Sequence, residues 1–371
     1  LIDGPRTYQA MFGAIEKARR YVFVESFIFE EAVEGDRRLS QLLGDARRRG
    51  VRIYVIYDAV GSLTTEKTFL QNLREADIAL CAFNPINPLD GRFSGVNHRD
   101  HRKIVVVDGE QAFPGGINFS QAYRIASKQL GKRGFSKRKA IEEGWRDTHI
   151  GIRGPGARHL EQLFRETWVR SECEGEISPP PAGEAVRGGE TLVQIVASTP
   201  DDENNVLYAM MLSVITYAQK SVDVTMAYFV PDDALETALS DAARRGVSVR
   251  LILPSYSDFS GVFYAGRAHY ADLLESGVRL YELESAFLHS KSVVVDGVWS
   301  SIGSTNFDWR SFVHNDEISV CVIDEGFAGE MERMFAADLA ESREITPASW
   351  KKRGFKERLK EWLWLPLQYW L

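Results

Sequence analysis

Short apolar runs and amphipathic segments alternate along the first half of the chain. Apolar positions recur at helical spacing from Tyr8 to Arg20, and the apolar run Tyr21–Phe29 follows. The next segments are expected to form, in turn, a helix, a strand, a helix and a strand: Leu39–Arg49, Val51–Tyr57, Thr68–Glu75 and Ile78–Phe83. This alternation predicts an α/β fold whose mixed or largely parallel sheet is covered by helices.

The second half of the chain repeats this order. Its expected elements are a helix and a strand three times over: Ser213–Lys220, Val222–Val230, Leu235–Arg245, Val247–Leu253, Tyr270–Glu275 and Val278–Leu283. The repetition predicts an internal duplication of two similar α/β units. We expect the units at residues 1–177 and 191–349, joined by a Pro- and Gly-rich linker at 178–190 and followed by a tail at 350–371.

Composition narrows the function only slightly. The 371 residues are 44% hydrophobic and 26% charged with a net charge of −7, so the overall basic character of a nucleic-acid-binding protein is missing. No run of 18 apolar residues occurs, so no membrane-spanning helix is expected. Because the chain starts at Leu1, we expect that residues preceded it. Cys81, Cys173 and Cys321 fit no metal-site or redox spacing, and reduced thiols are expected.

A histidine, a lysine and an asparagine surround the apolar run at 104–107. His101 and Lys103 are two residues apart, so on a strand their side chains would share a face. Asp108-Gly109 then predicts a tight hairpin turn, and Asn118 stands in the returning segment. An imidazole, a fixed cation and an amide donor in one pocket are suited to phosphoryl chemistry.

The same set returns 188 residues later. Four positions recur at this offset: His289, Lys291, Asp296 and Asn306. Chance does not readily produce four matches, so both sets are candidate catalytic residues rather than two unrelated structural histidines. At Asp108 and Asp296 the following glycine favours a turn role over a chemical one.

Each asparagine is followed by a strand that carries an acid. These are Asp147 in Trp-Arg-Asp-Thr-His-Ile and Glu317 in Asn-Asp-Glu-Ile-Ser-Val. A carboxylate on the second ring nitrogen would fix the tautomer of a histidine and stabilise its imidazolium. The alternative is two surface acids at strand ends.

The first half also contains a basic insertion. His101 and Asp147 are 46 residues apart, whereas His289 and Glu317 are 28 apart. The extra segment carries seven cations: Arg124, Lys128, Lys132, Arg133, Lys137, Arg138 and Lys139. Such a run is either a solvated face or loop, or a surface that attracts anionic headgroups to the pocket.

The tail combines tryptophans with basic residues. Four of the eight tryptophans lie in the last 22 residues, and Trp362, Trp364 and Trp370 are the candidate anchors. This composition is typical of a helix at a membrane interface. The alternatives are a helix docked on the protein's own core and a dimer contact.

The paired His-x-Lys-x4-Asp motifs, each with a downstream asparagine, resemble the signatures of the phospholipase D superfamily. Within it, the chain is most similar to bacterial cardiolipin synthases. Further stretches carry the resemblance, which covers nearly the whole chain: Trp145–His149, Tyr228–Pro231 and Gly303–Phe312. In one departure, Met226-Ala227 replaces the Thr-Pro commonly found in the family.

The resemblance implies two phospholipase D-like α/β/α units, related by pseudo-twofold symmetry, with one shared active site. One histidine would form a phosphohistidine and the other would act as general acid and base. Family similarity makes His101 the nucleophile, although the near symmetry of the sequence does not decide this. The lysines and asparagines would neutralise phosphate oxygens. Further substrate-binding candidates are Gly116, Ser304, Arg310 and Asn315.

The expected function is phosphatidyl transfer between phospholipids, with cardiolipin made from phosphatidylglycerol and glycerol released. No cofactor or metal is expected, because each lysine would repel a divalent cation. The expected partners are an anionic phospholipid and the bacterial cytoplasmic membrane. The protein would bind this membrane peripherally or through a segment missing from this chain. An oligomeric state is possible. The alternatives are a phospholipase D-type hydrolase, a nuclease, which the net charge disfavours, and an inactive membrane-binding scaffold.

Overall fold

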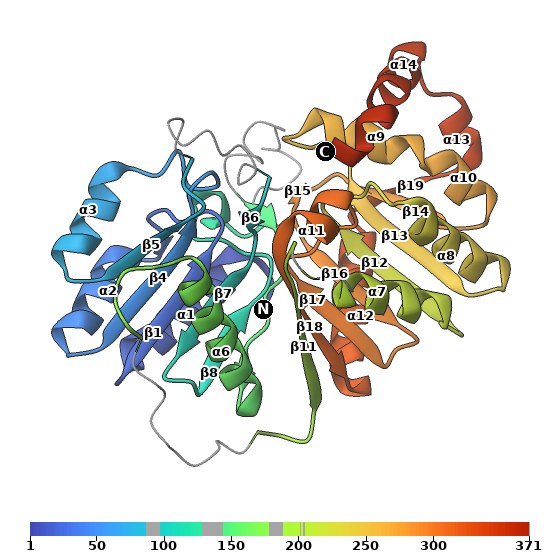
Figure 1. The fold of residues 1–371 in the computed structure, drawn as a ribbon. Coiled ribbons are helices and arrows are strands. Elements are labelled where there is room, and N and C mark those ends of the chain that lie inside the picture. Colours follow the sequence, from blue (N-terminus) through green and yellow to red (C-terminus); the bar gives the residue numbers. More distant parts are fainter. Residues whose placement is uncertain (87–96, 128–143, 178–187, 201, 203–204, 371) are drawn as a thin grey trace.

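The structure is a computed structural model that describes residues 1–86, 97–127, 144–177, 188–200, 202 and 205–370. Figure 1 shows two α/β halves side by side, the N-terminal half in blue and green and the C-terminal half in yellow to red. Each half is built around a mixed β-sheet flanked by helices. The predicted fold class is therefore confirmed.

The N-terminal half contains a sheet with the strand order β10-β8-β7-β1-β4-β5. Strand β1 pairs in parallel with β4 and antiparallel with β7. The elements of this half are α1 Asp3–Lys17, β1 Tyr21–Ser26, β2 Val33–Glu34, β3 Arg37–Arg38, α2 Leu39–Arg48, β4 Arg52–Asp58, α3 Lys67–Glu75, β5 Ala79–Phe83, β6 Arg99–Asp100, β7 Lys103–Val107, β8 Gln111–Pro114, η2 Gln121–Tyr123 (a 3-10 helix), β9 Trp145–Arg146, β10 Ile152–Arg153 and α6 Pro155–Arg170.

The C-terminal half repeats this arrangement. Its sheet has the order β11-β18-β17-β16-β12-β13-β14-β19, and β12 pairs in parallel with β13 and antiparallel with β16. Its elements are β11 Leu192–Ser198, α7 Val206–Thr216, β12 Ser221–Met226, α8 Asp233–Arg244, β13 Ser248–Pro254, α9 Ser260–Ala268, α10 Tyr270–Glu275, β14 Arg279–Leu283, β15 Phe287–Leu288, β16 Lys291–Val295, β17 Trp299–Gly303, α11 Trp309–Val313, β18 Asn315–Ile323, α12 Glu325–Leu339, β19 Ser342–Ile345, α13 Pro347–Lys351, α14 Phe355–Trp364 and η4 Leu365–Trp370 (a 3-10 helix).

Most of the predicted linker, residues 178–187, lies outside the described residues, and the domain boundaries stay a prediction. Beyond it, β11 is an edge strand of the second sheet and pairs with β18.

One hydrophobic core joins the two sheets. Helices α6 and α12 contribute Phe164 and Met331 to a cluster that also contains strand residues of both halves: Phe23, Val106, Val294 and Val320. The other faces of the sheets are covered separately, by α1–α3 in the first half and by α7, α8 and α10 in the second. Each large apolar side chain buried in this way contributes about 1.5–3 kcal/mol. Separating the halves would expose the shared core, so their relative position is fixed by packing.

The two Asp-Gly turns have the structural role that the sequence favours. Both aspartates adopt positive φ angles, 55° at Asp108 and 56° at Asp296. The Asp108 carboxylate accepts hydrogen bonds from the backbone N–H groups of residues 19, 20 and 21. Asp296 does the same for residues 219, 220 and 221. The turn role is thus confirmed, because each acid ties its hairpin to the start of the neighbouring strand.

The prediction of reduced thiols is wrong for two of the three cysteines. Cys81 in β5 forms a disulfide with Cys173, just after α6, and Cys321 is free and buried. The partners are separated by 92 residues, and only the packing of α6 against the sheet brings their Cα atoms to 5.5 Å. Sequence spacing carries no sign of such a pair.

Candidate active site

Two short parallel strand pairs bring the histidine of each half to the acid of the other half. β6 pairs with the start of β18, and β15 pairs with β9. The backbone N–H of His101 donates to the carbonyl oxygen of Asp316 over 3.0 Å, and the backbone N–H of His289 donates to the carbonyl oxygen of Arg146 over 2.9 Å. Each histidine is therefore held one residue away from the predicted acid of the opposite half.

In the first pair, His101 contacts Glu317. The His101 Nδ1 lies 2.9 Å from Glu317 Oε1. The hydroxyl of Ser304 donates to the other oxygen, Oε2, and the Asn315 amide reaches Oε1 at 3.4 Å. All four side chains are buried. Two of the candidate substrate-binding residues, Ser304 and Asn315, thus contact the carboxylate.

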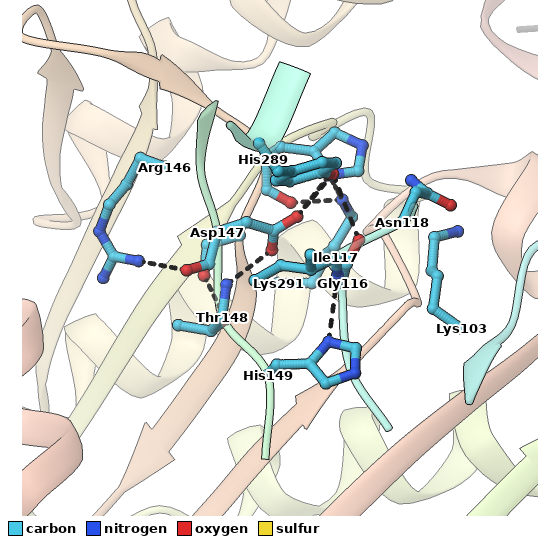
Figure 2. A network of polar contacts seen from close by, with 12 residues as sticks. Lys103, Gly116, Ile117, Asn118, Arg146, Asp147, Thr148, His149, His289 and Lys291 are labelled. Atoms are coloured by element: carbon cyan, nitrogen blue, oxygen red, sulfur yellow. Dashed lines mark hydrogen bonds and ion pairs between the residues drawn. The ribbon is translucent and has the colours of Figure 1, made fainter. Parts of the chain in front are cut away.

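In the second pair, His289 contacts Asp147 (Figure 2). The His289 Nδ1 lies 2.7 Å from Asp147 Oδ2, and the Thr148 N–H donates to Oδ1 over 2.7 Å. The Lys291 Nζ is 2.9 Å from the same Nδ1. A Cβ at Gly116 would lie 2.2 Å from Asp147 Oδ1, so only glycine permits this carboxylate to sit there. Candidate residue Gly116 thus makes room for the acid.

The lysines and asparagines lie beside the two pairs. Lys103 and Lys291 open β7 and β16 and are almost fully buried. The side-chain oxygen of Asn118 accepts from the Ile28 N–H at 3.1 Å, and that of Asn306 accepts from the Tyr228 N–H at 3.3 Å. With the oxygens occupied, the amide NH₂ groups remain as donors. Figure 2 shows Asn118, Lys103, Lys291 and His289 close together.

Burial controls the charges in the site. It lowers the pKa of His101 to about 4 and holds the pKa of His289 well below its usual range. It also lowers the pKa of Lys103 to about 7 and that of Lys291 to about 8. Burial opposes ionisation of Glu317, but His101 and Lys103 bring its pKa below the ordinary value. Both imidazoles are therefore neutral at pH 7, and the lysines lose their protons near neutrality.

The remaining candidates are Arg310 and the basic insertion. Arg310 is half-buried in α11. Burial is the main cause that lowers the pKa of Arg99, and the nearby charge of Arg310 lowers it further. Of the basic insertion, Arg124 follows η2, and the cations at 128–139 lie outside the described residues. Within the described ranges, no group of three or more His, Cys, Asp or Glu residues is arranged to hold a metal ion.

Sequence reasoning missed Tyr123. Its hydroxyl lies 3.0 Å from both Asp147 Oδ2 and His289 Nδ1. The repeat gives no signal for it, because Ser311 stands at the matching position of the second half. The sequence also did not predict the aromatic rings that contact the histidines. The ring centroid of Phe27 lies 5.1 Å from that of His101, and the ring centroid of Trp145 lies 4.7 Å from that of His289.

The duplicated fold and the paired His-Lys-Asn sets define an enzyme of the phospholipase D superfamily. Comparison with known proteins agrees. The family model "Cardiolipin synthase, PLD-like domain" matches residues 11–124 and 211–339. The cardiolipin synthase of Geobacillus kaustophilus is 36% identical over 97% of this chain and 70% of its own length, and cardiolipin synthase A of Pseudomonas aeruginosa is 38% identical over 94% and 68%. The chain belongs to the cardiolipin synthase family.

A solved structure supports the fold. The phosphatidylserine synthase of Haemophilus influenzae superposes with a TM-score of 0.71 at 12% identity, over 98% of this chain and 91% of that one. At this identity the likeness concerns the fold alone.

The pKa values predict a bell-shaped pH dependence. On a soluble short-chain phosphodiester, kcat/KM should rise as His101 loses its proton around pH 4, because only the neutral imidazole is nucleophilic. It should fall again as pH passes about 7 to 8, where Lys103 and Lys291 lose the charge that binds the phosphate. A pH–rate profile checks this, with circular dichroism confirming the fold at each pH. Activity that keeps rising well above the lysine pKa values would contradict it.

Proposed function

We propose that this protein transfers a phosphatidyl group between phospholipids, making cardiolipin from two molecules of phosphatidylglycerol and releasing glycerol. The observation that carries the proposal is the crossed pairing of His101 with Glu317 and His289 with Asp147. It engages Nδ1 of both imidazoles and leaves two Nε2 atoms for one in-line displacement at phosphorus. The names of the relatives supply the lipid class.

In the first step, His101 Nε2 attacks the phosphorus of the donor lipid. The P–N bond forms, the P–O bond to glycerol breaks, and His289 gives a proton to the leaving oxygen. The negative phosphodiester raises the pKa of a nearby imidazole, so His289, which is neutral in the free protein, takes up a proton from water when the substrate binds. Lys103, Lys291, Asn118 and Asn306 stabilise the charge on the non-bridging oxygens.

In the second step, the hydroxyl of the acceptor lipid attacks the phosphohistidine. His289 takes the hydroxyl proton, the new P–O bond forms and His101 leaves as neutral imidazole. Glu317 and Asp147 stabilise the cationic rings in turn. The two lysines supply the positive charge that a metal ion provides in other phosphoryl-transfer sites. If water replaced the acceptor lipid, the same steps would give a phospholipase D-type hydrolase.

Product analysis tests the function. Purified protein with phosphatidylglycerol vesicles should release one glycerol for each cardiolipin formed, and chelators should leave the rate largely unchanged because the lysines carry the charge. His101→Ala and His289→Ala, each with the fold retained, should lose the activity. Phosphatidic acid as the main lipid product would establish the hydrolase instead. Activity lost in chelator and restored by one specific divalent ion would contradict the metal-free mechanism.

Trapping tests the division of labour. With a donor labelled in the phosphatidyl group, an alkaline quench should recover label on His101, because the P–N bond survives base better than acid. The His289→Ala variant should accumulate this intermediate when the leaving group needs no proton. Label found on His289 alone would reverse the two roles.

We further propose that the tail brings the site to an anionic bilayer. Four apolar residues of α14 share one helical face, because they follow the spacing i, i+4, i+7, i+8: Phe355, Leu359, Trp362 and Leu363. This tail face is exposed, with 78% of Phe355 and 69% of Trp362 accessible. The neighbouring cations Lys351, Lys352 and Lys356 are also exposed. Apolar side chains beside exposed lysines are the pattern of an interfacial helix.

The opposite face of the tail is bound to the protein. Glu361 is buried and pairs with Arg353, and Trp364 packs against Val230 and Ala265. After α14, Tyr369 contacts Trp309 at the start of α11, three residues beyond Asn306. The tail is therefore docked on its own domain near the site, and its outer face is open. No helix in the described part of the chain is long and apolar enough to cross a bilayer.

A triple variant tests the tail face without disturbing the docked side. Phe355→Ser, Leu359→Ser and Trp362→Ser together should weaken binding to phosphatidylglycerol vesicles by about tenfold or more, since each exposed apolar side chain contributes on the order of 1 kcal/mol. Turnover of a soluble short-chain substrate should hardly change.

The matched control replaces three exposed apolar residues elsewhere, Leu63, Val169 and Tyr217, with serine. It should bind vesicles like the parent. Unchanged lipid affinity in the tail variant, with a lower melting temperature or an altered oligomer, would favour a packing role for the tail instead.

A further inference from the structure

The two histidine–carboxylate pairs differ in whether a hydroxyl group binds the same carboxylate oxygen as the imidazole. In the first pair, the Ser304 hydroxyl binds Glu317 Oε2 while Oε1 faces the imidazole and receives only a long contact, 3.4 Å, from the Asn315 amide. In the second pair, the Tyr123 hydroxyl binds Asp147 Oδ2, the same oxygen that faces His289. Tyr123 thus competes with the imidazole for its acceptor, whereas Ser304 does not.

The position of Tyr123 is firmly determined. The tyrosine is fully buried, and its ring packs against Trp145 and His289. Its backbone lies so close to α1 that a Cβ at Gly4 would be 1.9 Å from the Tyr123 carbonyl oxygen. The preceding segment is held by the Tyr8 hydroxyl, which donates to the Asn118 carbonyl oxygen over 2.6 Å. A side chain held on all sides in this way keeps its hydroxyl between the acid and the imidazole.

The two hydroxyl positions suit two different tasks. The imidazole ring of a phosphohistidine that is protonated at Nδ1 carries a positive charge. This intermediate must last until the acceptor arrives, so its ring benefits from a carboxylate oxygen that is not shared with a hydroxyl. A proton shuttle must release its proton readily, so its imidazolium must not be held too tightly. Tyr123 donates to Asp147 Oδ2 and withdraws part of the charge that would stabilise the imidazolium of His289. Burial, followed by the charge of Asp147, holds the pKa of Tyr123 well above its usual range, so the phenol keeps its proton.

We propose that Tyr123 is a positioning residue that makes the two pairs unequal and fits His289 for proton transfer, leaving His101 as the nucleophile. Tyr123 acts through Asp147 and His289. The other charged or titratable groups that face His289 are Lys291, Lys103, His101 and Tyr228, whose ring meets that of His289 edge-on. This inference deepens the proposed function and rests on it for the direction of proton transfer.

The test removes only the hydroxyl. In Tyr123→Phe, Asp147 Oδ2 is left to the imidazole alone, so the imidazolium of His289 should become more stable. The acid limb of the kcat profile should move to higher pH, and kcat on a short-chain phosphatidylglycerol should fall about tenfold or more, with KM within about twofold.

A substrate with a nitrophenol leaving group sharpens the test. Nitrophenolate leaves without a proton, so release of the first nitrophenol in a burst should be close to the parental rate in Tyr123→Phe. The control is Tyr21→Phe, which removes another buried hydroxyl that donates to a carboxylate, Glu161 at 2.8 Å, far from the histidines. It should leave both substrates and the pH profile unchanged.

The outcomes separate this inference from the proposed function. If Tyr123→Phe loses activity equally on both substrates, with the parental pH profile, the hydroxyl has only a structural role and the inference fails. An unchanged kcat would overturn it as well. If the parent cleaves the nitrophenyl ester but makes no cardiolipin, the proposed function fails. The role of Tyr123 is then still decided by comparing Tyr123→Phe with Tyr21→Phe in the hydrolysis reaction, in which water is the acceptor.

Discussion

The exchange of partners between the two halves is the constraint on which the rest of the structure depends. His101 is oriented by Glu317 and His289 by Asp147, so neither half has a complete site alone. The short parallel pairings of β6 with β18 and β15 with β9 set the distance, and the shared core around α6 and α12 keeps the halves from sliding. Gly116 and Ser304 serve the same exchange, because one gives the carboxylate space and the other gives it a hydrogen bond.

Behind these pairs the twofold symmetry breaks down. The neighbours of His101 are Asp100 and Arg102, whereas those of His289 are Leu288 and Ser290. Arg102 is buried and donates to the carbonyl oxygens of Glu317 and Ser198, which ties β18 to β11. Burial raises the pKa of the nearby Glu25 to about 7. A buried carboxylate is tolerated where a cation compensates it. Behind the second pair the buried cation is Arg146, which pairs with Asp338 and Asp3, so the two charged layers are built from different residues.

The sequence predicted the α/β fold and the pairing of two His-Lys-Asn sets because both rest on local patterns that occur twice. Strand β16, for example, is a short apolar run after His-x-Lys and before Asp-Gly, just as β7 is. Helix α7 was misplaced, since its apolar residues surround the whole helix and give no period, and it begins at Val206 rather than at residue 213. The disulfide, the crossed pairing and Tyr123 could not be predicted, because each depends on contacts between segments at least 24 residues apart that have no matching pattern.

In the proposed mechanism, the two lysines allow the site to work without a large rearrangement. In the free protein, burial disfavours the charged forms of Lys103 and Lys291, and each also lies close enough to the imidazoles to disfavour protonated histidine. A bound phosphodiester reverses both effects, because its negative charge stabilises the ammonium groups and the imidazolium together. The interaction then strengthens as charge builds on the non-bridging oxygens in the transition state, where a dry and preformed pair of cations is most effective. The same burial that weakens the free cations is therefore what makes them selective for the reacting phosphate over water.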